Sequence, residues 1–149
     1  MSQTLFTIGY QSATQGALVD ALVEARVELL ADIRALPLSR RAGFSKTSLK
    51  AAVEEAGIAY RHWRDLGTPK EGRDAARRGD YSTLREVYSG QLELPEAMAA
   101  LAELQSLAAE QRTCLLCFCG EAEKCHRSLL IEQGFADFDV RHLHPHMMG

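Results

Sequence analysis

Short apolar runs alternate with amphipathic segments along this chain, and that alternation is the strongest constraint on its fold. A parallel sheet needs a crossover between successive strands, and helices usually supply it. The pattern therefore predicts an α/β domain, a three-layer α/β/α arrangement with a mostly parallel sheet of about five strands. The strands are expected at 4–9, 27–33, 58–63, 113–118 and 137–143, with helices between them, including 81–90, 93–110 and 125–133.

Local signals mark where the first two helices should begin. Ser12 and Gln15 match a capping box, in which the two side chains bond to each other's backbone N–H groups. Leu18 and Leu22 then follow at helical spacing. Ser45 is expected to cap the next helix.

Length and charge narrow the class of protein. A chain of 149 residues has room for one domain, which we expect to span 1–149. The formal net charge of −3 gives no reason to expect general affinity for nucleic acid or membranes. No apolar run approaches the roughly 18 residues that cross a bilayer, and the first ten residues lack the features of a secretory signal. We therefore expect a cytoplasmic protein.

Side chains that can bind a ligand or take part in catalysis are concentrated in four segments, 9–12, 34–44, 62–70 and 117–127. Each of these segments follows an expected strand. In open α/β sheets, ligands bind outside the carboxyl ends of the strands. The sequence therefore predicts a functional site at that edge of the sheet.

All four cysteines lie within twelve residues, which closes no long loop and argues against a disulfide framework. Side chains alternate on a strand, so Cys114 should face the core opposite to Cys117 and Cys119. The start of the following helix would favour a thiolate nearby. Catalytic candidates are therefore Cys117, Cys119, Cys125 and His126, with Cys117 or Cys119 as the activated thiol and His126 as general base or charge partner.

Two other interpretations of the cysteines stay open. They can simply pack in the core, as many cysteines do. Alternatively, a structural zinc ion can be bound by Cys117, Cys119, Cys125 and His126. Their spacing, C-x-C-x5-C-H, lacks the C-x2–4-C pair that is usual in zinc sites. No cofactor is expected, and no metal is assigned. A phosphatase-like loop has the motif C-x5-R, in which an arginine stands six positions after the cysteine. Six positions after Cys119 this chain has Cys125, so a phosphatase-like loop is disfavoured.

Arginines at the same edge predict an anionic ligand, since guanidinium groups bind phosphate and carboxylate in a bidentate manner. The competing interpretation is an Asp32–Arg34 network that only holds the loop. Helix starts also favour anions. The ligand-binding candidates are Tyr10, Ser12, Asp32, Arg34, Arg40, Arg41, Lys70 and Arg127.

Four segments together resemble the widespread bacterial domain of unknown function family 488 (DUF488). They are 7–10 (TIGY), 27–45, 56–73 (with LGTPKE) and 115–127 (LLCFCGEAEKCHR). The family pattern implies a glutamate where this chain carries Cys119. The resemblance covers almost the whole chain and supports the α/β fold, but the family has no settled activity. It implies that one constellation is formed by Asp32, Arg34, Cys117, Cys125, His126 and Arg127.

The leading hypothesis is an enzyme with cysteine-dependent chemistry on a phosphorylated or other anionic ligand, derived from a nucleotide or nucleic acid. The first alternative is a non-catalytic module that binds a nucleotide or a short nucleic acid, and the second is a structural zinc domain. No membrane partner is expected. Apolar positions on the 93–110 segment make a homodimer compatible with the sequence.

Overall fold

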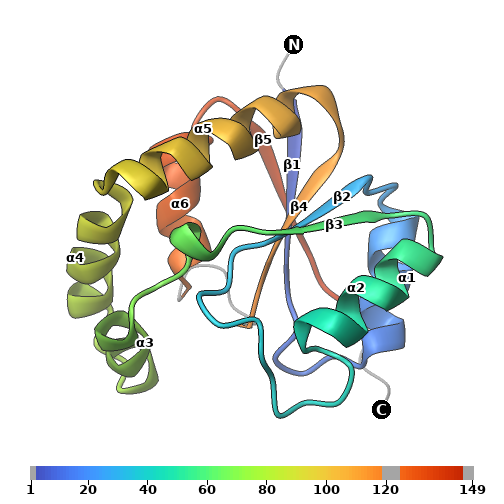
Figure 1. Cartoon of the computed structure of the whole chain (residues 1–149), viewed down its shortest axis with the longest axis horizontal. Coiled ribbons are helices and arrows are strands. Elements are labelled where there is room, and N and C mark those ends of the chain that lie inside the picture. The colour runs from blue at the N-terminus through green and yellow to red at the C-terminus, as the bar shows by residue number, and fades with distance from the viewer. Residues whose placement is uncertain (1–2, 119–124, 146–149) are drawn as a thin grey trace.

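A five-stranded parallel sheet with strand order β3-β2-β4-β1-β5 forms the middle layer of the protein (Figure 1). The computed structural model describes residues 3–118 and 125–145. Its strands are β1 (Thr4–Gly9), β2 (Leu29–Asp32), β3 (Ala59–His62), β4 (Thr113–Cys117) and β5 (Asp139–Leu143). Its helices are α1 (Gln15–Glu24), α2 (Lys46–Glu55), the 3-10 helix η1 (Arg64–Leu66), α3 (Lys70–Arg77), α4 (Tyr81–Leu92), α5 (Pro95–Glu110) and α6 (His126–Gly134).

Helices cover both faces of the sheet, which confirms the three-layer α/β/α class. Figure 1 shows α1 and α2 on one side of the sheet and α3 to α6 on the other. Each face has its own apolar core. Leu18 and Leu49 belong to the core under α1 and α2, whereas Leu104 and Leu130 belong to the core under α5 and α6.

Strand β4 lies at the centre and is buried at all five positions. Its side chains alternate between the two cores, because successive residues of a strand point to opposite faces. Cys114 and Leu116 pack with α1 and α2, whereas Leu115 and Cys117 pack on the other face. The predicted opposition of Cys114 and Cys117 is confirmed.

Both predicted helix caps need correction. The N-cap of α1 is Thr14, whose side chain accepts a hydrogen bond from Ala17 N at 3.1 Å, so the capping box at Ser12 is wrong. The Gln15 side chain instead donates to the carbonyl oxygen of Gly43 at 2.6 Å. Ser45 does hold the N-cap position of α2, but its hydroxyl accepts from Ser39 N at 3.0 Å. At α2 a contact with the long loop after β2 replaces the side-chain cap, whereas α1 keeps a local cap at Thr14 and gains a contact with that loop through Gln15.

The carboxyl ends of three neighbouring strands meet at one edge of the sheet. Cys117 pairs with Gly9 and Leu116 pairs with Asp32. The chain continues this register beyond β2, where Ile33 N donates to Leu116 O at 3.2 Å. The arginine-bearing loop and the cysteine segment therefore start side by side, as predicted. β1 and β2 lead to helices on one face and β4 leads to α6 on the other, which is the arrangement at which open α/β sheets bind ligands.

No helix within residues 3–118 or 125–145 is long and apolar enough to span a membrane.

Gly67 packs closely against the backbone of Ala35, in the loop after β2, and a substitution can test this contact. A Cβ atom at Gly67 would lie 2.2 Å from the backbone nitrogen of Ala35, and backbone cannot move aside cheaply. We expect Gly67→Ala to lower the free energy of unfolding by about 2–3 kcal/mol, as overpacking does. The measurement is urea denaturation. As a matched control, a Cβ at Gly16 in α1 meets nothing within 4 Å, so Gly16→Ala should leave stability unchanged or raise it by up to about 1 kcal/mol. Equal stability of the two variants would contradict the packing argument.

Candidate functional site

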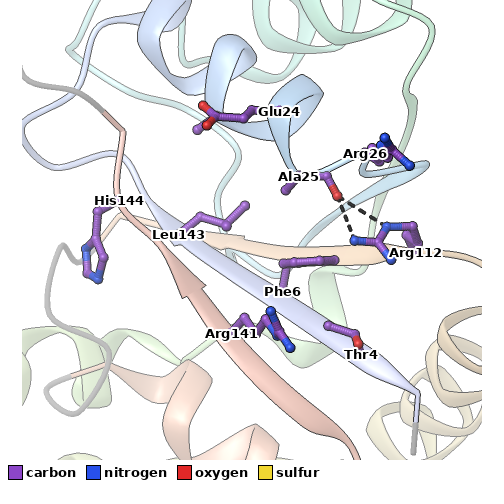
Figure 2. Close-up of a pocket in the computed structure, with 10 residues that line it drawn as sticks. Thr4, Phe6, Glu24, Ala25, Arg26, Arg112, Arg141, Leu143 and His144 are labelled. Carbon is purple, nitrogen blue, oxygen red and sulfur yellow. Dashed lines mark hydrogen bonds between the residues drawn. The ribbon is translucent and has the colours of Figure 1, made fainter.

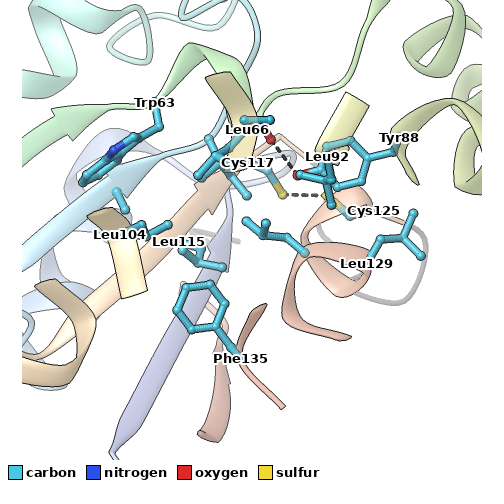
Figure 3. Close-up of a cluster of buried hydrophobic side chains, with 14 of the residues drawn as sticks. Trp63, Leu66, Tyr88, Leu92, Leu104, Leu115, Cys117, Cys125, Leu129 and Phe135 are labelled. Atoms are coloured by element: carbon cyan, nitrogen blue, oxygen red, sulfur yellow. Dashed lines mark hydrogen bonds between the residues drawn. The ribbon is translucent and has the colours of Figure 1, made fainter. Parts of the chain in front are cut away.

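Two cysteine sulfurs lie in contact where β4 and α6 meet. Cys117 is the last residue of β4 and Cys125 is the N-cap of α6. Their Sγ atoms are 2.8 Å apart, and the residues are only 1% and 2% exposed. Figure 3 shows the pair facing each other in the core beside Leu66, Tyr88 and Leu129. Eight positions separate them in the sequence, so the fold itself brings the two thiols together.

The imidazole of His126 is held between a carbonyl and one of these thiols. Its Nε2 lies 3.0 Å from the carbonyl oxygen of Ile33, and its Nδ1 lies 3.6 Å from Cys125 Sγ. A carbonyl oxygen can only accept, so Nε2 carries the hydrogen. In the neutral ring Nδ1 then presents a lone pair to the sulfur. His126 is therefore oriented as a proton acceptor for Cys125.

The start of α6 adds a positive electrostatic environment. The first N–H groups of a helix and its dipole favour a negative charge at this end. Cys125 occupies the N-cap position without forming a side-chain capping bond. Arg127, in the first turn, is buried with a relative exposure of 1%. The helix start acts on the Cys125 end of the thiol pair, whereas the positive charge of Arg127 acts on Cys114.

Cys114 has a different environment from the pair. It is fully buried on the opposite face of β4, and its Sγ donates weakly to Leu115 O at 3.7 Å. Burial raises the pKa of the Cys114 thiol, and the positive charge of Arg127 only partly opposes that rise. Cys114 is therefore a protonated core residue, which makes it a natural control for the reactive candidates.

Tyr88 of α4 covers the cysteine pair from the helical side. Its hydroxyl donates to the carbonyl oxygen of Leu66 at 2.6 Å, and its ring meets that of His126 edge to face at 5.1 Å. Burial raises the pKa of Tyr88 well above its ordinary value, and negative charge on Cys125 or Cys117 would raise it further. Tyr88 is therefore a neutral hydrogen-bond donor that fixes the wall of the site.

Asp32 and Arg34 form a buried ion pair at the end of β2. Arg34 Nε and Nη2 donate to the two carboxylate oxygens of Asp32 at 2.9 and 2.7 Å, and the residues are 0% and 5% exposed. Arg34 Nη1 donates to the Tyr10 hydroxyl at 3.2 Å and to Phe44 O at 2.6 Å. The Tyr60 hydroxyl also donates to Asp32. The geometry thus matches the interpretation in which this network holds the loop.

The pKa values in this network follow from burial and from the ion pair. Burial by itself lowers the pKa of Arg34, but the hydrogen bonds and negative charge of Asp32 outweigh it, so the pKa is raised. For Tyr60, burial raises the pKa and the charge of Asp32 raises it further. Arg34 stays a cation and Tyr60 a neutral donor throughout the physiological range.

The remaining predicted ligand-binding residues lie at the surface or serve the loop. Arg41 donates to Ala13 O and lies over the Phe44 ring at 5.7 Å. Lys70 is exposed and 3.5 Å from Asp74. Ser12 and Arg40 are exposed, and the described contacts do not join them to the cysteine pair. Cys119 lies outside the described residues.

Sequence reasoning missed four contributors to the site. The carbonyl groups of Ile33 and Phe44 carry no side-chain signal, because any residue supplies a carbonyl oxygen. Tyr88 follows the apolar helical spacing of Leu84 and Leu92 and therefore resembles an ordinary core residue. Tyr60 does carry a signal, since it alternates with Ile58 on the third strand and is a polar aromatic in a buried position.

A separate surface pocket of about 660 Å³ contains none of the predicted site residues (Figure 2). It is lined by residues of β1, β5 and the end of α1, and by Arg112, which donates to Ala25 O at 2.9 Å. Of the described residues, no three of histidine, cysteine, aspartate and glutamate are placed to hold a metal ion. The thiol pair with His126 is therefore the strongest site for chemistry in the described part of the chain.

Removing the charge of Asp32 should destabilise the whole edge. We expect Asp32→Asn to lower the free energy of unfolding by about 3 kcal/mol or more, because it leaves the buried Arg34 cation uncompensated. Urea denaturation at pH 7 measures the change. The control is Glu132→Gln, which removes the exposed ion pair with Arg85 and should cost less than about 1 kcal/mol. Comparable losses in the two variants would refute the structural role of the Asp32–Arg34 pair.

Stability should fall in alkali because of Tyr60 and Tyr88. In the unfolded chain both phenols lose their protons near a pKa of about 10, whereas the fold raises both pKa values. Above that pH the unfolded state binds fewer protons than the folded state, so the free energy of unfolding decreases as pH rises. Urea denaturation between about pH 8 and 11 measures the slope. The double variant Tyr60→Phe/Tyr88→Phe should make the slope shallower, with the remainder due to the buried Cys114 thiol, whose pKa is also raised. An unchanged slope would contradict the assignment.

Comparison with known proteins gives one match. No curated protein and no solved structure matches the chain significantly. The profile described as "Domain of unknown function DUF488" matches residues 15–133, which include α1, the Asp32–Arg34 pair, the cysteine pair and most of α6. The match covers well over half of the chain, and this protein therefore belongs to the DUF488 family.

Proposed function

We propose that this protein is a thiol-dependent enzyme that acts on a small phosphorylated or otherwise anionic substrate, such as a nucleotide-derived compound. The observation that carries the proposal is the placement of His126 between Ile33 O and Cys125 Sγ at the start of α6. This placement supports Cys125 as the nucleophile. Cys117 or Cys119 was the expectation from sequence, but His126 Nδ1 lies against Cys125.

The proposed chemistry begins with a proton transfer. His126 Nδ1 accepts the Cys125 proton while Nε2 keeps its hydrogen bond to Ile33 O. The thiolate then attacks an electrophilic centre of the substrate. The helix start stabilises the thiolate and is a favourable place for an anionic group, with Arg127 in the same turn. Such thiol chemistry suits a reducing compartment like the cytoplasm.

The arginines of the loop after β2 have divided roles in this proposal. Arg34 is bound by Asp32, so it positions the loop instead of adding net positive charge at the ligand. Arg40 and Arg41 are the candidates for contacts at the rim, with Ser12 after β1 and Lys70 at the start of α3. Tyr10 is buried and its hydroxyl binds Arg34, so in this proposal it supports the loop. Leu94 and Met98, at the start of α5, are exposed apolar side chains. We propose that this surface can be covered by a second copy of the chain in a homodimer.

Burial of the two thiols supports a second candidate, a non-catalytic module that binds a nucleotide or a short nucleic acid. A group that is 1% or 2% exposed is poorly placed to meet a large substrate. In this case the same basic residues bind the ligand and the cysteines only pack.

A structural zinc domain is the third candidate, and elemental analysis of the purified protein tests it directly.

Alkylation by iodoacetamide, read by peptide mapping, tests the role of Cys125. We expect Cys125 to react faster than Cys114 at every pH, because His126 Nδ1 lies 3.6 Å from Cys125 Sγ and the helix start favours the thiolate. His126→Gln keeps a donor for Ile33 O but no base, so it should slow Cys125 by about tenfold or more. Equal rates for Cys114 and Cys125 would reject the enzyme proposal in favour of the packing interpretation.

A thermal-shift screen with nucleotides and phosphorylated metabolites separates the enzyme from the binding module. A ligand at 100 times its dissociation constant stabilises the folded state by about 2.7 kcal/mol. If Arg40→Ala or Arg41→Ala weakens a hit, Cys125→Ser leaves its binding unchanged, and the wild-type chain does not turn the hit over, the binding module is the better account.

A further inference from the structure

We infer that Cys117 and Cys125 form a redox-active dithiol pair that reduces small hydroperoxides and ends as a Cys117–Cys125 disulfide. The inference rests on the proposed role of Cys125 as nucleophile, but it does not depend on the anionic substrate. It assigns a function to Cys117, which the proposed thiol chemistry leaves unused.

Geometry is the first argument for the pair. The two Sγ atoms are 2.8 Å apart, and a disulfide bond measures about 2.04 Å. Bond formation therefore requires the sulfurs to approach by less than an ångström. Cys117 is held by the sheet, where it pairs with Gly9. Cys125 is the N-cap residue of α6.

The surroundings of the two sulfurs are different, and this gives each cysteine its own role. Cys125 has His126 Nδ1 at 3.6 Å and the N-terminus of α6 at its backbone. Cys117 lies at the end of a central strand, in the apolar layer with Leu115. Cys125 is therefore the attacking thiol, and Cys117 is the resolving thiol that acts in the second step.

The burial of Cys117 and Cys125 limits which oxidants can reach them. The cysteines are almost fully covered, and Leu66, Tyr88 and Leu129 surround them in an apolar core. A disulfide on another folded protein cannot reach such a pair. A small hydroperoxide is not subject to this obstacle. Hydrogen peroxide is the simplest member of this class.

The reaction balances with these groups alone. His126 takes the proton of Cys125, and the thiolate attacks the terminal oxygen of the hydroperoxide. The O–O bond breaks, and the leaving alkoxide or hydroxide takes the proton from His126, which leaves Cys125 as a sulfenic acid. The Cys117 thiol then attacks that sulfur, the S–S bond forms and water leaves. The two thiols supply the two electrons, and an external dithiol restores them by exchange.

The test is to treat the reduced protein with hydrogen peroxide and to analyse it by mass spectrometry. We expect the wild-type chain to lose two hydrogens, to contain a Cys117–Cys125 crosslink in the peptide map, and to recover with dithiothreitol. Cys117→Ser should stop at a dimedone-reactive sulfenic acid on Cys125. Cys125→Ser should slow peroxide consumption by about tenfold or more, as loss of an activated thiol does. Cys114→Ser is the matched control, since it removes an equally buried thiol from the other face of β4, and it should behave as wild type.

Other results would overturn the inference. A crosslink that survives Cys117→Ser but disappears in Cys119→Ser would assign the resolving role to another residue. Fast alkylation of Cys125 without any Cys117–Cys125 crosslink would reject the dithiol pair and leave the proposed thiol enzyme intact. Slow alkylation of Cys125 together with an absent crosslink would reject both. Cys117→Ala provides a second variant in case buried serine prevents folding, and circular dichroism checks each variant.

Discussion

The insertion of β4 between β1 and β2 is the constraint on which the rest of the structure depends. A strand in this position must be apolar on both faces, because helices cover both sides of the sheet. It also aligns its carboxyl end with those of its two neighbours, so that Cys117 lies beside Gly9 and the residue before it lies beside Asp32. The loops that leave these three strands therefore begin at one place. The contact of His126 with Ile33 O depends on that alignment.

The Asp32–Arg34 pair is the second organising interaction, and it stabilises the same edge. A buried cation is tolerated only when it is paired and hydrogen-bonded, and here Asp32, Tyr10 and Phe44 meet that requirement. The pair thereby ties the loop after β2 to the loop after β1. Arg34 thus supports the loop after β2, and the thiol pair lies on the β4 side of the same edge.

Sequence patterns predicted the layers of the fold well and the details of the site less well. Alternating apolar runs were sufficient for the class and for the strands, since burial depends on periodicity that a single sequence displays. The cap at Ser12 was wrong, because Thr14 and a long-range bond from Gln15 to Gly43 satisfy that turn. Cys117, Cys125 and His126 were recognised as candidates. Which thiol meets the imidazole was not predictable, because that depends on the direction in which α6 leaves the sheet.

The amino-acid sequence by itself determined the α/β class, the opposite faces of Cys114 and Cys117, and the edge of the sheet at which the candidate side chains gather. These properties depend on local periodicity and on the general geometry of parallel sheets. Only the tertiary structure decided the strand order, the internal use of Arg34, and the contacts of Cys125 with Cys117 and His126. The strand order and the bond between His126 and Ile33 O join segments far apart in the chain, and the Cys117–Cys125 contact depends on ångström-scale packing that residue types do not encode.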